Sequence, residues 1–229
     1  MGQFTELKAP DGQVIPAYLA EPKGPAKGGI VVIQEIFGIN SHIRAVTDGY
    51  AAEGYLAIAP AIFHRIKPNV ELGYEQDDMT QGMTLKNAVE NLPAPGVMQD
   101  IQVAIKQVAR AGKVGIVGFC YGGGVCNNAA VANPQLAAAV PFYGRQPQAD
   151  QVSRIQAPLL LHYAEKDDGV NKGWPDYEAA LKANGKTYEA HVYPGTQHGF
   201  HNDSTPRYDE AAAELAWQRT IDWFKEYLA

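Results

Sequence analysis

Short apolar runs alternate with segments of helical spacing through most of the chain. Six nearly continuous apolar runs are typical of strands in a parallel sheet that is covered on both faces, namely 30–33, 55–59, 114–119, 137–143, 158–162 and 188–193. Five segments repeat apolar residues with helical spacing, namely 41–53, 97–109, 121–131, 175–183 and 208–228. This alternation predicts an α/β fold, with a mostly parallel central sheet and helices on both faces.

A hairpin, the apolar face of the last helix and a polar stretch complete the predicted architecture. Residues 4–7 and 14–19 are predicted to form an N-terminal hairpin, because Asp11-Gly12 between them is a strong turn dipeptide. Residues 208–228 are predicted to bury one face, made of Ala212, Leu215, Ala216, Ile221, Trp223, Phe224 and Leu228. The polar stretch 64–96 fits either a helical excursion or active-site cover, or a surface insertion without a chemical role. We expect one domain over residues 1–229.

Composition and charge narrow the classes of partner. The 229 residues include 19 Lys and Arg against 25 Asp and Glu, which gives a net charge of −6, and the basic residues form no cluster. We therefore expect a small-molecule or protein ligand, with no nucleic acid and no membrane. Two cysteines cannot build a disulfide framework, and the first residues lack the pattern of a signal peptide, so a cytoplasmic location is expected. The oligomeric state leaves no trace in the sequence.

The segment around Cys120 carries the strongest chemical signal. The apolar run 114–119 leads into Gly-Phe-Cys-Tyr-Gly at 118–122 and then into a predicted helix. This order matches the nucleophile elbow, a strained turn that lifts its central side chain above the sheet, where Gly118 and Gly122 avoid crowding the backbone. The N-terminus of the following helix stabilises negative charge on the thiol. The alternative is a small buried cysteine in a glycine-rich turn.

A nucleophile at such an elbow needs a histidine base and an orienting carboxylate, which follow it along the chain in the order acid, then histidine. Asp167 and Asp168 come directly after the run 158–162, and spacing does not choose between them. His198 stands in a glycine-flanked turn after the last run. His162 and His191 fit less well, because both lie inside predicted strands.

The loop 34–38, Gln-Glu-Ile-Phe-Gly, ends the first apolar run. In α/β-hydrolases this loop supplies one backbone N–H of the oxyanion hole and the residue after the nucleophile supplies the other, which indicates Ile36 and Tyr121. Glu35 would repel an oxyanion unless it were protonated, paired or turned toward the thiol, and it fits a solvated strand end equally well. Five aromatic residues are candidates for a substrate pocket or for ordinary core, with the first two ranked highest: Phe37, Tyr121, Tyr143, Trp174 and Phe200.

Taken together, these blocks resemble the dienelactone hydrolase (carboxymethylenebutenolidase) family, a cysteine-using branch of the α/β-hydrolases. The resemblance rests on residues 34–38, 118–123, 167–170 and 198–200 and covers almost the whole chain. It implies a lactone or activated-ester hydrolase without a cofactor or metal, with Cys120, Asp167 and His198 as the triad. It also implies that Glu35 lies close to the thiol.

The chain departs from the family pattern where the substrate carboxylate is expected to bind. The family has one arginine in the polar excursion and one shortly after the catalytic histidine, whereas here Arg65 and Arg207 stand at other positions. We therefore expect a substrate other than dienelactone itself. The alternatives are a thioesterase or peptidase on the same fold, or a redox-sensing or binding module that keeps a reactive thiol without turnover.

Overall fold

The computed structural model describes all 229 residues, which form two compact units, Met1–Val114 and Gly115–Ala229. The prediction of one domain over the whole chain stays a prediction. No helix is both long enough and apolar enough to cross a membrane.

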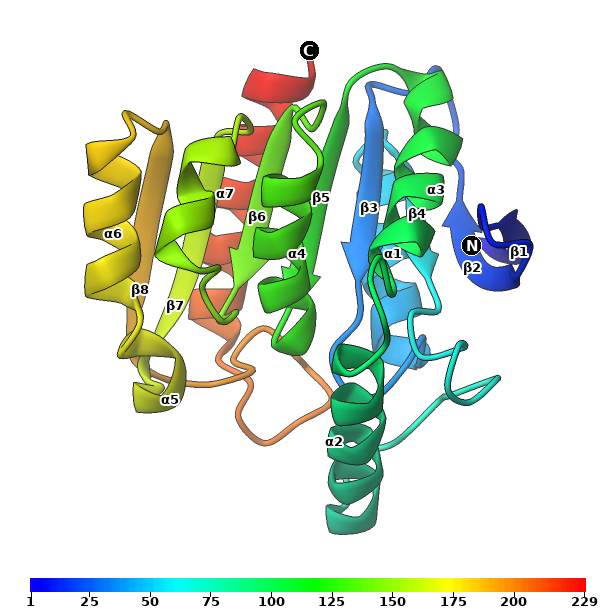
Figure 1. Ribbon diagram of the computed structural model, residues 1–229, viewed down its shortest axis with the longest axis horizontal. Helices are drawn as coiled ribbons and strands as arrows, with labels where there is room; N and C mark the ends of the chain where they lie inside the picture. The colour runs from blue at the N-terminus through cyan, green and yellow to red at the C-terminus, as the bar shows by residue number, and fades with distance from the viewer. The chain divides into compact units, whose positions relative to one another are not determined.

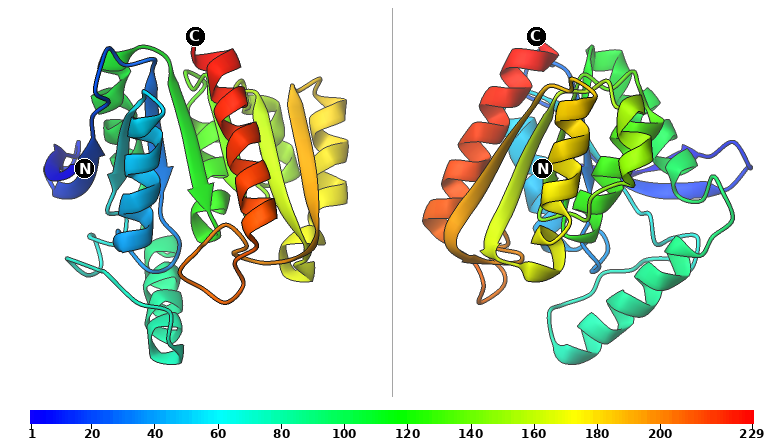
Figure 2. Two further views of the ribbon diagram at one scale, coloured as in Figure 1. Left: turned by 180° about the vertical axis from the view of Figure 1, so that it is seen from behind. Right: turned by 60° about the vertical axis from the view of Figure 1, so that its left-hand side comes forward.

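The first unit contains the predicted hairpin and the first two parallel strands (Figure 1). Its strand order is β1-β2-β4-β3, from β1 (Gln3–Lys8), β2 (Val14–Ala20), β4 (Leu56–Pro60) and β3 (Gly29–Ile33). The pairs β1–β2 and β2–β4 are antiparallel, and β3–β4 is parallel. Helices α1 (Ser41–Ala52) and α3 (Met98–Val108) cover opposite faces of β3 and β4, as Figures 1 and 2 show together.

The polar stretch 64–96 contains a helix, α2 (Gln76–Glu90), which projects away from the strands of its unit (Figure 2, right). Glu75 and Asp78 form a capping box at its N-terminus. Only Gly82, Leu85 and Val89 of α2 are buried. The helical interpretation of this stretch is therefore confirmed.

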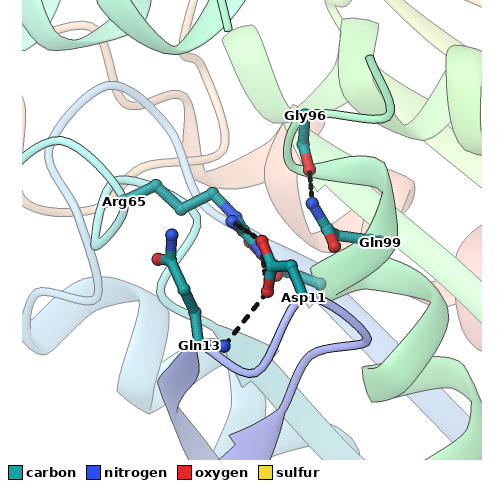
Figure 3. Close-up of polar contacts among 6 residues, drawn as sticks. Asp11, Gln13, Arg65, Gly96 and Gln99 are labelled. Carbon is teal, nitrogen blue, oxygen red and sulfur yellow. Dashed lines mark hydrogen bonds and ion pairs between the residues drawn. The ribbon is translucent and has the colours of Figure 1, made fainter. Parts of the chain in front are cut away.

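Arg65 joins the hairpin turn to α3 within the first unit (Figure 3). Its guanidinium donates to both carboxylate oxygens of Asp100, at 2.7 and 2.6 Å, and to Asp11 at 2.6 Å. The Asp100 side chain is fully buried. The Arg65 guanidinium is thus hydrogen-bonded to the carboxylates of both Asp100 and Asp11.

The second unit is a parallel sheet with strand order β5-β6-β7-β8. The strands are β5 (Val114–Phe119), β6 (Ala138–Phe142), β7 (Leu159–Lys166) and β8 (Tyr188–Gln197). Helices α4 (Tyr121–Ala132) and α6 (Trp174–Ala183) cover one face, and α7 (Glu210–Leu228) covers the other (Figures 1 and 2). Three short helices complete the chain: η1 (Ala109–Ala111), η2 (Ala149–Arg154) and α5 (Asp168–Asn171).

The prediction of the residues that α7 buries is partly wrong. Leu215 is 47% exposed, whereas Ala213 and Thr220 are buried. Thr220 is buried because its hydroxyl has partners there, the carbonyl of Ala216 at 2.8 Å and the ring of His162 at 3.1 Å. Thr220 therefore belongs to the buried face of α7 although it is polar, because its hydroxyl is hydrogen-bonded. The apolar pattern alone did not include it.

Candidate active site

The turn at Cys120 has the strained geometry that the sequence predicts. Cys120 lies between β5 and α4 with φ 59° and ψ −120°, a backbone conformation that residues other than glycine rarely adopt. Its N–H donates to the carbonyl of Phe142 at 3.1 Å, and its carbonyl accepts from Gly123 at 2.9 Å. A Cβ at Gly118 would overlap the carbonyl of Gly122, which confirms the steric reason for glycine at that position.

A second glycine contact at the elbow was not predicted. Gly123 in the first turn of α4 packs backbone to backbone on Gly144, just after β6, and a Cβ on either residue would overlap the other. This contact seats α4 on the end of β6. The two residues are 21 positions apart, so the only sequence signal was the extra glycine that follows Gly122.

His198 contacts both other members of the predicted triad. Its Nδ1 lies 2.6 Å from Oδ2 of Asp167, and its ring is hydrogen-bonded to the Cys120 side chain. Asp167 directly follows β7 and His198 directly follows β8, so all three side chains stand at the carboxyl ends of parallel strands. Asp168 instead begins α5. Of the two aspartates, Asp167 is the one that contacts His198.

A side-chain contact also joins the ends of β7 and β8, the two strands that lead into Asp167 and His198. Oε2 of Glu165 accepts a hydrogen bond from the backbone N–H of Gly195 at 2.7 Å. Gly195 has φ +76° and Gly199 has φ +86°, so the turn that holds His198 depends on residues without a Cβ.

The ring of Tyr143 packs against His198, and the ring of Phe200 packs in turn against Tyr143. The ring of Tyr143 lies 5.0 Å from the imidazole and that of Phe200 lies 5.4 Å from Tyr143. Both residues are buried. Tyr143 has φ 35°, a second strained backbone position beside this site. Trp174, by contrast, is half-buried and packs against the ring of Tyr163.

The partners of His198 set its charge. Burial favours the neutral ring, but hydrogen bonds and charge from Asp167 and Cys120 outweigh it and raise the pKa of His198 to about 10. The ordinary value is 6.5. His198 therefore stabilises the fold fully below about pH 6.5, and this contribution is lost as the pH rises toward 10.

An NMR titration of the imidazole signals is expected to place the pKa of His198 near 10 in the wild type. The variants Cys120→Ala and Asp167→Asn should each lower it, because each removes a group that raises it. His162 is the internal reference, since burial keeps the pKa of its ring well below 6.5. A wild-type midpoint near 6.5 would contradict the described contacts.

Cys126 and His162 are both fully buried, and each has a hydrogen-bond partner. Cys126 is fully buried in α4, its Sγ lies 3.6 Å from the carbonyl of Ile116, and burial raises the pKa of its thiol. His162 is fully buried in β7 and bonds Tyr193 at 2.8 Å. Nowhere do three or more His, Cys, Asp or Glu side chains gather in a way that could hold a metal ion.

The predicted residues of the loop 34–38 belong to the first unit. Glu35, Ile36 and Phe37 are all buried, at 5% exposure or less. Phe37 packs edge to face against Tyr74 at 4.7 Å. A solvated strand end is therefore the wrong interpretation for Glu35, because its side chain is withdrawn from water.

The two arginines noted in the sequence differ in their surroundings. Arg65 is held by Asp11 and Asp100, as described above. The guanidinium of Arg207 lies beside the backbone of Gly199, since a Cβ at Gly199 would stand 3.7 Å from its Nη2. Arg207 therefore lies beside the turn that holds His198.

A strained turn after a parallel strand, followed by an acid loop and a histidine loop in that chain order, defines the α/β-hydrolase class. The model of the dienelactone hydrolase family matches residues 15–228. A protein of Escherichia coli K12 named "Putative carboxymethylenebutenolidase" is 35% identical over 98% of this chain and 86% of its own length. The chain belongs to the dienelactone hydrolase family and is a hydrolase of that family.

Solved structures agree with this assignment. The crystal structure of a "Putative Dienelactone Hydrolase" from Klebsiella pneumoniae is 34% identical, covers 99% of both chains and has a TM-score of 0.86. An esterase of Pyrococcus furiosus, at 11% identity and a TM-score of 0.73 over 100% of this chain and 93% of its own, shares the fold alone. The predicted α/β-hydrolase fold is thus confirmed.

Proposed function

We propose that the chain hydrolyses lactones or activated esters through a thioester on Cys120. The observation that carries the proposal is the pair of contacts made by His198, with Asp167 at 2.6 Å and with the Cys120 side chain. A thiol beside a histidine that a carboxylate orients is the arrangement of an activated nucleophile.

In the first half of the reaction Glu35 accepts the Cys120 proton, as argued below, and sulfur attacks the carbonyl carbon to give a tetrahedral oxyanion. Asp167 stabilises the imidazolium of His198, which carries its proton at neutral pH because its pKa is about 10. The oxyanion collapses, the C–O bond to the alcohol breaks, and His198 gives its proton to the leaving oxygen. In the second half His198 takes a proton from water, the hydroxide attacks the thioester, and Cys120 leaves as a thiolate that regains its proton from Glu35 as the acid is released.

The oxyanion requires donors that are fixed before the reaction begins. We propose the backbone N–H groups of Ile36 and Tyr121 for this role, on the basis of the family resemblance and of their positions after β3 and after Cys120. Phe37 is proposed to contact the substrate beside them.

The chemistry of sulfur favours activated substrates. A thiolate attacks readily but is also a good leaving group, so the tetrahedral species reverts unless the alcohol departs easily. Enol lactones and aryl esters meet this condition better than alkyl esters or amides. The fixed partners of Arg65 favour a substrate that does not depend on that arginine for a carboxylate contact.

A panel of enol lactones, aryl esters, thioesters and peptide amides, assayed on the wild type and on Cys120→Ser, tests the proposal. We expect many equivalents of acid per equivalent of protein on lactones and aryl esters, and little on amides. A preference for thioesters would favour a thioesterase, and a preference for amides would favour a peptidase. Release of at most one equivalent of acid per equivalent of protein would favour a sensing or binding module.

Glu35 is proposed to bond the resting thiol of Cys120 and to accept its proton when substrate enters. The burial of Glu35 supports this role, because a buried carboxyl group needs a polar partner. Glu35→Gln is expected to shift the pH–rate profile and to change the rate at which iodoacetamide alkylates Cys120. If both stay at their wild-type values, the role of Glu35 is wrong.

A further inference from the structure

The polar stretch 64–96 packs on the loop 34–38, which we call the Ile36 loop. The backbone N–H of Leu72 donates to the carbonyl of Phe37 at 2.8 Å. The ring of Tyr74 meets Phe37 edge to face, with centroids 4.7 Å apart. The residues that lead into α2 are therefore bonded to the loop through both backbone and side chains.

Two further contacts hold the same segment in place. Gly38, at φ +80°, pairs with Glu71 in an isolated antiparallel bridge. The side-chain amide of Asn40 donates to the carbonyl of Leu72 at 3.2 Å and to the Tyr74 hydroxyl at 3.0 Å. Residues 71–74, which lead into α2, are thus joined to the Ile36 loop and to Asn40 just after it.

The middle of α2 then makes a contact that only glycine permits. A Cβ at Gly82 would stand 2.5 Å from the carbonyl oxygen of Ile36 and 3.2 Å from its Cβ. The closest atom is backbone, so it cannot turn aside as a flexible side chain would. Glycine is a poor helix former, and its place in the middle of α2 is explained by this close approach.

We propose that α2 positions the backbone of Ile36 and that Gly82 is the positioning residue. The inference rests on the proposed function, in which the N–H of Ile36 donates to the oxyanion. The carbonyl that Gly82 contacts and that N–H lie in successive peptide planes joined at the Cα of Ile36, so a displacement of the carbonyl shifts the N–H through that Cα. The polar stretch, for which the sequence left two roles open, then acts on the chemistry through the backbone of the Ile36 loop.

The test compares two reactions of Cys120 in Gly82→Ala. Hydrolysis of p-nitrophenyl acetate passes through an oxyanion, whereas alkylation by iodoacetamide forms the S–C bond with loss of iodide and passes through none. We expect kcat/KM for hydrolysis to fall about 10- to 100-fold, since losing one oxyanion donor completely costs about 10²–10³ in kcat. The alkylation rate should stay at its wild-type value. Met83→Ala, at an exposed position of the same helix, should change neither reaction.

Tyr74→Leu is the second variant, because it removes the edge contact with Phe37 without adding atoms against Ile36. It should show the same split between the two reactions, to a smaller extent. The inference is overturned if both folded variants keep wild-type hydrolysis, or if hydrolysis and alkylation fall in parallel. Failure of the proposed function is distinguishable, because turnover would then persist in Cys120→Ala.

Discussion

Cys120→Ala is expected to lower kcat for p-nitrophenyl acetate by about 10³-fold or more, since removing the nucleophile of a triad costs up to about 10⁶. The variant keeps the strained turn but loses the atom that would form the thioester. The fold should persist, because Cys120 is only partly buried and its backbone bonds do not involve sulfur. Steady-state release of p-nitrophenol measures the effect directly.

Cys126→Ala is the matched control for this variant. It also removes a thiol from α4, but a fully buried one whose Sγ contacts the carbonyl of Ile116. It should lose some stability and keep wild-type kcat. Near-normal turnover in Cys120→Ala, or equal losses in both variants, would remove Cys120 from the role of nucleophile.

Arg65→Met is expected to lower the free energy of unfolding by about 3–5 kcal/mol, the usual cost of leaving one member of a buried ion pair alone. The Arg65 side chain is 6% exposed and that of Asp100 is fully buried, and two hydrogen bonds below 2.8 Å join them. Such a loss is a large share of the about 5–15 kcal/mol that stabilises a typical protein. Urea denaturation followed by circular dichroism is the measurement.

Two control variants show whether the cost of Arg65→Met comes from the burial of its ion pair. Arg110→Met breaks the pair with Glu21, which has a similar 2.8 Å distance but side chains 55% and 63% exposed, and should cost at most about 1 kcal/mol. The double variant Arg65→Met/Asp100→Leu should recover most of the loss, because no buried charge is left alone. A cost for Arg65→Met as small as that for Arg110→Met would contradict the argument.

Local patterns predicted most of the elements but not where two of the strands end. The runs 158–162 and 188–193 extend in the structure to Lys166 and Gln197, so β7 and β8 continue through polar residues. Pairing there is carried by the backbone, as in the contact of Lys166 with Gln197 after a register shift. In both strands the run of apolar residues therefore ends before the backbone pairing between β7 and β8 ends. This extension brings β7 and β8 up to Asp167 and His198.

The strained turn at Cys120 was predictable because the elbow imposes local constraints that are visible in the sequence. The supporting contacts were not, since they join residues far apart in the chain. Gly123 on Gly144, Arg65 on Asp100 and Gly82 on Ile36 each depend on how two elements pack. The helix α2 was also hard to assign, because few of its residues are buried and its apolar spacing is weak.

The most direct test of the central claim is to identify the acyl-enzyme. Wild-type protein is mixed with p-nitrophenyl acetate, quenched with acid within the first turnover, and analysed by intact mass and peptide mapping. The account predicts one acetyl group on the peptide that contains Cys120, lost again as acetate is released, and none on that peptide in Cys120→Ala. Turnover with an acetyl group on another residue, or with no acylated protein at any quench time, would contradict it.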